Sequence, residues 1–173
     1  MNSASFLYFA YGSNMSSRRL RAADRAPSAV FIETARLAGH RLVFDKIGMD
    51  GSAKADCEPS ADPGDQVHGA LFRIEARDRA ALDRAEGLGK GYDAFEVDVA
   101  SASGVATRAL TYLATLKNPA LLPFDWYVRH VLLGARECGL PASYVAVIEK
   151  VPCMVDADDE RRSRERARHP TSA

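Results

Sequence analysis

The sequence lacks several features that define common classes of protein. It carries no excess charge, because 23 Lys and Arg residues balance 23 Asp and Glu residues. Proteins that bind nucleic acid or a membrane surface electrostatically usually present a basic face, so neither partner is expected. No apolar run approaches the length of a membrane span, and no basic segment before an apolar stretch marks a signal peptide. These absences predict a cytoplasmic protein.

Cysteine and histidine are also scarce. The three cysteines (Cys57, Cys138 and Cys153) are odd in number, widely separated and without a Cys-x-x-Cys pair. They predict free thiols in a reducing compartment rather than a disulfide framework. The four histidines show no paired ligand spacing, so no metal site is expected.

The length of 173 residues and the hydrophobic content of 47% predict one domain with a substantial core, which we assign to residues 1–155. Apolar and alternating patterns predict strands over residues 6–11, 29–37, 40–44, 67–74, 95–99 and 105–114. Between them, residues 45–65 predict a mobile loop with a short strand at 53–57. Helices are predicted over residues 16–26, 78–86, 124–135 and 144–151. The class is therefore α+β with a strongly bent or barrel-like sheet, and the charged residues 156–173 predict a disordered tail.

The most informative stretch lies at the beginning of the chain. An aromatic run with strand preference ends abruptly in Gly12, Ser13 and Asn14, and a helix is predicted directly after it. A strand that enters a small-residue turn at a helix N-terminus exposes backbone N–H groups without internal partners, which can bind an anion. Ser13 or Asn14 could instead serve only to cap the helix.

Glu86 differs from the other acids of its predicted helix. It follows the apolar Leu82 by four residues, so it points toward the protein interior rather than toward water. It also lies in the last turn, where the helix dipole disfavours an anion. Both effects are expected to raise the pKa of a carboxyl group, as a general base requires. The alternative is an ordinary solvated or capping acid.

Several of these segments together resemble one family. Tyr8 to Met15 (YFAYGSNM), Leu82 to Gly87 (LDRAEG) and the pair Gly91-Tyr92 are similar to motifs of the gamma-glutamylcyclotransferase family. The similarity continues through residues 108–113 and 134–141 and covers roughly residues 5–152 in order.

This resemblance implies a small mixed sheet folded as a barrel with flanking helices, and an enzyme that needs no cofactor. The family reaction is the attack of the α-amine of a γ-glutamyl group on its own γ-amide carbonyl, which forms 5-oxoproline and releases the attached amine. The resemblance implies that Glu86 is the general base and that the motif loop binds the glutamyl group through its backbone. The implied substrate-binding positions are Tyr8, Phe9, Ala10, Tyr11, Gly12, Ser13, Asn14, Tyr92, Tyr112 and Tyr127.

Other interpretations of these residues remain. Tyr8, Phe9, Tyr92, Tyr112 and Tyr127 could simply pack in the core. A binding module could keep the fold and bind small γ-glutamyl compounds without turnover. A hydrolase with Ser13 as nucleophile is a poorer hypothesis, since the sequence has no Gly-x-Ser-x-Gly elbow. The sequence leaves open whether the leaving group is an amino acid, a dipeptide, an amine or a natural product, and whether the protein forms a homodimer.

Overall fold

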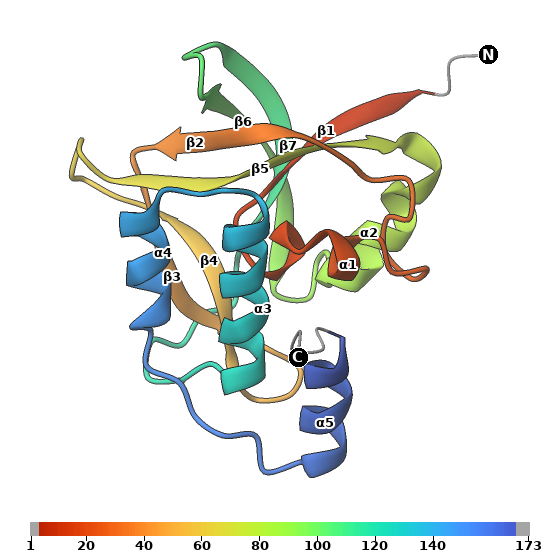
Figure 1. Cartoon of the computed structure of the whole chain (residues 1–173), viewed down its shortest axis with the longest axis vertical. Coiled ribbons are helices and arrows are strands. Elements are labelled where there is room, and N and C mark those ends of the chain that lie inside the picture. The colour runs from red at the N-terminus through yellow and green to blue at the C-terminus, as the bar shows by residue number, and fades with distance from the viewer. Residues whose placement is uncertain (1–3, 169–173) are drawn as a thin grey trace.

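The computed structural model describes residues 4–168, which form seven strands and five α-helices (Figure 1). The strands are β1 (Ser5–Ala10), β2 (Val30–Ala38), β3 (His40–Ile47), β4 (Ala53–Pro59), β5 (Gln66–Glu75), β6 (Tyr92–Ser101) and β7 (Ala106–Ala114). The α-helices are α1 (Ser17–Leu20), α2 (Arg79–Glu86), α3 (Asp125–Glu137), α4 (Ala142–Glu149) and α5 (Asp159–Ala167). Two 3-10 helices are η1 (Ser13–Met15) and η2 (Ala76–Asp78).

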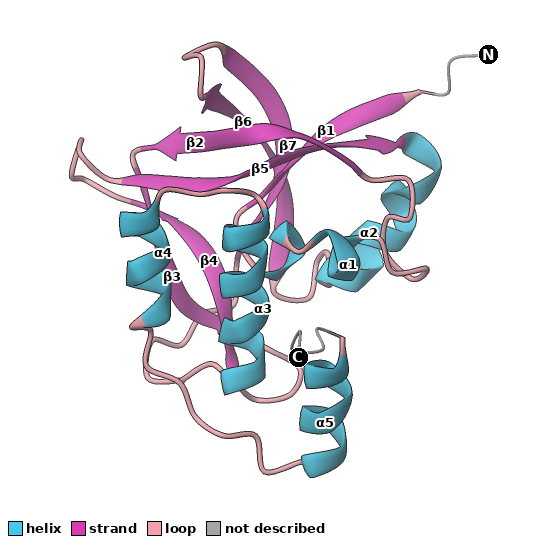
Figure 2. Cartoon of the chain, in the orientation of Figure 1, coloured by secondary structure: helices cyan, strands magenta, loops and turns pink. Residues whose placement is uncertain are grey.

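Five strands close into a barrel in the order β1-β5-β2-β6-β7. Neighbouring strands are antiparallel except β1 and β7, which run parallel and close the barrel where Tyr8 pairs with Leu110. Figure 2 shows these strands at one end of the molecule, with α3, α4 and α5 gathered beyond them. The predicted α+β class with a small mixed, barrel-like sheet and flanking helices is confirmed.

The core of the barrel holds the first strand firmly in place. Phe9 is fully buried, and the strand beside it, β5, buries most of its side chains. Gly69 of β5 makes this close packing possible, because a Cβ there would lie 2.4 Å from the carbonyl oxygen of Ala10 and 2.7 Å from the Phe9 ring. The end of β1, from which the glycine-containing turn departs, is therefore closely packed on β5.

A separate two-stranded sheet forms where a mobile loop was predicted. The predicted short strand is present and extends to Pro59 as β4, while β3 continues to Ile47 instead of ending at Phe44. The two strands pair from His40 opposite Pro59 to Ile47 opposite Ala53. Residues 48–55 between and within these strands are rich in small residues, so the local pattern does not reveal a pairing that depends on the rest of the fold.

The first helix is shorter than predicted. α1 ends at Leu20 rather than near Ala26, and the chain then turns back, with the N–H of Ala26 donating to the carbonyl of Leu20 at 3.0 Å. Ser16 caps the helix by accepting a hydrogen bond from the N–H of Arg19. The turn matters for the site because it brings Arg25, predicted to lie on a helix, back toward α2.

The charged tail, predicted to be disordered, contains the helix α5. It lacks an apolar stripe, but charge pairs attach it to α3: Arg162 donates to Asp125 at 3.0 Å, and Glu165 lies 3.0 Å from His130. Ion pairs to another element can order a helix that cannot bury apolar surface. Composition alone does not reveal such pairs, which is why the tail was predicted to be disordered. Residues 169–173 of the predicted tail lie outside the described residues, and the domain boundary at residue 155 stays a prediction.

Candidate active site

The motif between β1 and α1 forms a compact turn. β1 ends at Ala10, and the 3-10 helix η1 begins at Ser13, where the N–H of Met15 donates to the carbonyl of Gly12 at 3.1 Å. Space at Gly12 is limited, because a Cβ there would lie 3.2 Å from the Cβ of Ala55. The cap of the following helix is Ser16, so Ser13 and Asn14 are not its capping residues.

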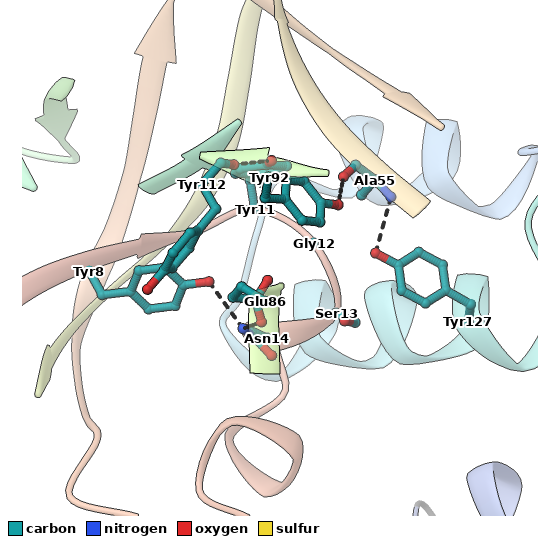
Figure 3. Close-up of a pocket in the computed structure, with 10 residues that line it drawn as sticks. All are labelled: Tyr8, Tyr11, Gly12, Ser13, Asn14, Ala55, Glu86, Tyr92, Tyr112 and Tyr127. Carbon is teal, nitrogen blue, oxygen red and sulfur yellow. Dashed lines mark hydrogen bonds between the residues drawn. The ribbon is translucent and has the colours of Figure 1, made fainter. Parts of the chain in front are cut away.

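Glu86 lies against this turn. It is the last residue of α2, which ends because Gly87 adopts the left-handed conformation with φ 71°. The amide nitrogen of Asn14 donates to Glu86 Oε1 at 2.8 Å and also to the hydroxyl of Tyr8 at 3.1 Å. The structure thus brings the predicted acid and the predicted motif together, and Asn14 is the motif residue that contacts Glu86 (Figure 3).

Arg25 is the second partner of this carboxylate, and no local pattern in the sequence predicts it. Its guanidinium donates to Glu86 Oε1 at 2.9 Å and to Asn14 Oδ1 at 3.2 Å. The two charged side chains are only 15% and 16% exposed. Among residues 4–168, the hydrogen bonds to the Glu86 carboxylate all go to Oε1, and Oε2 has no partner.

A small pocket opens at this point, and its wall is dominated by tyrosines (Figure 3). Of the predicted positions, Phe9 and Ala10 do not line it, because both are buried in the barrel core. One lining residue, Ala55 of β4, was not predicted, since nothing local marks an alanine as part of a site. The lining consists of Tyr8, Tyr11, Gly12, Ser13, Asn14, Ala55, Glu86, Tyr92, Tyr112 and Tyr127.

Hydrogen bonds hold the tyrosines in fixed positions. Tyr11 donates to the carbonyl of Tyr112 at 2.5 Å, and Tyr92 donates to the carbonyl of Ala55. The hydroxyl of Tyr127 accepts from the N–H of Ala55 at 3.0 Å. The partners lie on β7 and β4, and the bond from Tyr92 of β6 to Ala55 joins the β3–β4 sheet to the barrel.

The tyrosine hydroxyls remain protonated. Burial raises the pKa of Tyr8 well above its ordinary value, and the negative charge of Glu86 adds to the effect. Burial likewise raises the pKa of Tyr92 and of Tyr127. For Tyr112, burial and the hydrogen bond to Asp83 both raise the pKa. The pocket therefore presents neutral hydroxyl groups rather than phenolates.

Ser13 lies beside a cation rather than a base. Its hydroxyl accepts a hydrogen bond from Arg19 Nε at 3.1 Å, and arginine has no atom that could take a proton from it. Arg19 in turn lies 3.3 Å from Glu165 of α5. This contact disfavours Ser13 as a nucleophile and links the C-terminal helix to the motif turn.

The described residues offer neither a metal site nor a membrane-spanning helix. Residues 4–168 contain no group of three or more His, Cys, Asp and Glu side chains that could hold a metal ion. None of the helices formed by these residues is long and apolar enough to cross a membrane. The compartment and a homodimer stay predictions.

Comparison with known proteins identifies the family. The model of the AIG2-like family matches residues 66–148, which include Glu86. Gamma-glutamylcyclotransferase of Mus musculus is 35% identical over 143 residues, which cover 80% of this chain and 74% of the mouse protein. The chain belongs to the gamma-glutamylcyclotransferase family. The Homo sapiens gamma-glutamylcyclotransferase is similarly 35% identical over 146 residues, covering 81% of this chain and 75% of the human protein.

The fold agrees with this assignment. A solved structure of a gamma-glutamyl cyclotransferase superposes with a TM-score of 0.80 at 30% identity and covers 94% of this chain and 99% of that one. The resemblance to the gamma-glutamylcyclotransferase family predicted from the motifs is therefore confirmed.

Proposed function

We propose that this chain is a γ-glutamyl cyclotransferase in which Glu86 is the general base. The observation that carries the proposal is the arrangement of its carboxylate in the pocket wall. Asn14 and Arg25 hold Oε1, and Oε2 has no partner among residues 4–168. A carboxylate that is oriented through one oxygen can accept a proton at the other.

The reaction balances with the residues of this pocket alone. The substrate α-ammonium transfers a proton to Glu86, and the freed amine attacks the γ-carbonyl carbon to form a new N–C bond and a five-membered ring. The tetrahedral intermediate then collapses, the bond from the same carbon to the leaving nitrogen breaks, and Glu86 returns the proton to that nitrogen. The ring nitrogen gives up its remaining surplus proton through the same carboxylate to the released amine, which leaves as an ammonium ion. The products are 5-oxoproline and the released amine, amino acid or peptide, and no cofactor is consumed.

The rest of the pocket supports this chemistry through position and polarity. Ring closure gains most from holding the glutamyl chain folded, which a small pocket with fixed tyrosine walls favours. Backbone N–H groups around Gly12, Ser13 and Asn14 are suited to bind the glutamyl group and the oxyanion that develops on the carbonyl. The hydroxyls of Tyr8 and Tyr127 accept hydrogen bonds from the protein, so their own protons are available for donation to the substrate.

A matched pair of variants tests the proposal. Glu86→Gln keeps the shape of the side chain but removes the proton acceptor, so we expect 5-oxoproline release to fall by about a hundredfold or more. Binding of the γ-glutamyl substrate, measured by calorimetry, should change little. Glu160→Gln, the same change at an exposed position of α5, serves as the control and should keep full activity.

Either of two results would reject the proposal. Full turnover by Glu86→Gln would exclude Glu86 as the base. Binding of γ-glutamyl compounds by the wild type without 5-oxoproline release from an amino acid, a dipeptide and an amine substrate would favour the non-catalytic binding module.

A further inference from the structure

A second pocket adjoins the first and is strongly basic. The two share four lining residues, namely Ser13, Glu86, Tyr92 and Tyr127. Glu86 is the one carboxylate in the second lining, which otherwise carries six cationic side chains: Arg19, Arg25, Lys46, Lys54, Arg84 and Lys90. Basic residues in such excess over acids make this pocket attractive to an anionic group.

Three of the six cations are neutralised by acids of the protein. Arg25 pairs with Glu86, and Arg19 pairs with Glu165. Lys54 donates to both oxygens of Asp50, at 3.0 and 2.8 Å. These three cations are therefore paired within the protein, and the cations of the pocket without an acidic partner in residues 4–168 are Lys46, Arg84 and Lys90.

Lys46 is the unusual member of that remainder. It is only 6% exposed, and among residues 4–168 its ammonium has no hydrogen bond or ion pair. The ammonium lies over the ring of Tyr92, 4.7 Å from the centroid. Gly91 provides the room, because a Cβ there would lie 2.8 Å from Lys46 Cε. The buried part of the side chain holds this ammonium at the pocket wall, where an anionic ligand can pair with it.

Burial is also the dominant influence on the titration of this lysine. It lowers the pKa of Lys46 below the ordinary value, and the negative charges of Glu86 and Asp50 act in the opposite direction. A bound carboxylate would favour the charged form of this lysine.

We propose that the second pocket binds the leaving group of a γ-glutamyl substrate and selects leaving groups that carry two carboxylates, one of which pairs with Lys46. This assignment of the second pocket rests on the proposed γ-glutamyl cyclotransferase function. Glu86 lines both pockets, and it must reach both the attacking amine and the leaving nitrogen, so a leaving group bonded to that nitrogen extends from the first pocket into the second.

The second carboxylate is assigned to the rim. Arg84 and Lys90 are exposed side chains at the edge of the pocket, and within residues 4–168 neither has an ion pair. One anionic group would leave this rim charge unmatched, whereas an acidic amino acid supplies a second carboxylate. We therefore expect γ-glutamyl-glutamate to be a better substrate than γ-glutamyl-alanine, and γ-glutamyl-propylamine to be the poorest.

The experiment measures kcat/KM for these three compounds by 5-oxoproline release. Since a hydrogen bond to a charged group is lost, Lys46→Met should lower kcat/KM for the two carboxylate-bearing substrates about 30-fold. It should change the propylamine substrate by less than about twofold. Lys150→Met, at an exposed position at the end of α4, is the matched control and should leave all three values unchanged.

A rim variant keeps the test independent of folding at the buried site. Lys90 is exposed, and Lys90→Met should lower kcat/KM for γ-glutamyl-glutamate several-fold. The value of kcat/KM for γ-glutamyl-alanine should not change. An equal loss on all three substrates in Lys46→Met would overturn the proposal, because it would place the glutamyl carboxylate or a structural role at this lysine. Wild-type turnover without preference among the three would refute the leaving-group selection alone, whereas no 5-oxoproline from any of them would refute the proposed function as well.

Discussion

Replacing Arg25 tests whether the orientation of Glu86 matters as much as its presence. Arg25→Met removes the guanidinium that holds Oε1 and keeps a side chain of similar length. At the observed 2.9 Å and an effective dielectric constant of about 20, two unit charges attract by roughly 6 kcal/mol before desolvation and side-chain ordering are subtracted.

The net effect is smaller than this gross attraction. Because both side chains are about 15% exposed, water screens part of the interaction, and a hydrogen bond to a charged group contributes about 1.5–3 kcal/mol net. If removing Arg25 costs about 2 kcal/mol of transition-state stabilisation by misplacing the base, kcat should fall about 30-fold. KM should change little, since Arg25 does not line the first pocket and its charge in the second is already paired with Glu86.

The assay is steady-state 5-oxoproline release, with melting temperature as a check on folding. Arg18→Met is the matched control, because Arg18 is exposed and lies in the same segment as the motif. Arg25→Lys keeps the charge without the planar fork and should recover part of the rate. If Arg25→Met keeps the wild-type kcat, or loses no more than Arg18→Met, the argument that Arg25 orients the base is wrong.

Two further predictions concern the elements that support the motif. A Cβ at Gly134 of α3 would lie 2.4 Å from the backbone nitrogen of Ser16, so Gly134→Ala should destabilise the protein by about 1–3 kcal/mol, seen as a lower melting temperature. The control Gly64→Ala, where the nearest atom is 3.2 Å away on the exposed side chain of Asp62, should lose much less. An unchanged melting temperature in Gly134→Ala would show that α3 can move away from the motif at no cost. Burial tends to raise the pKa of Glu165, but the hydrogen bond to His130 and the charge of Arg19 outweigh it and lower the value to about 2. A carboxyl group with a lowered folded pKa stabilises the protein above its ordinary pKa, and the contribution disappears as the pH falls from about 4.5 to about 2. Glu165→Gln should therefore unfold more easily at neutral pH by about 1–2 kcal/mol after discounting for solvent, and a chemical-unfolding difference that persists undiminished at pH 2 would contradict this assignment.

Local patterns were sufficient to predict the parts of the site that depend on neighbouring residues. The aromatic strand, the turn at Gly12 and the helix ending at Gly87 follow from propensities that act over a few residues. The orientation of Glu86 toward the interior follows from the helical repeat, because it lies one turn after the buried Leu82. The resemblance to the family then connected the two segments, which no local rule does.

The remaining parts of the site are set by contacts between distant positions. Arg25 reaches Glu86 because α1 ends early and the chain turns back, and the pattern of residues 16–26 predicted a longer helix. Lys46 and Ala55 reach the pocket because β3 and β4 pair outside the barrel, a pairing that the predicted strands at residues 40–44 and 53–57 did not include.

The C-terminal segment shows the same difference between what local patterns predict and what contacts between distant residues decide. By itself, the sequence determined the fold class, the family, the motif turn and the acid, because these depend on short-range periodicity and on residue types at fixed spacing. Only the tertiary structure decided which cations surround the acid and that a charged tail folds as α5 onto α3. The physical reason is that an ion pair between residues far apart in the sequence leaves no periodic trace, since either charged residue looks like ordinary solvated surface until the fold brings its partner close.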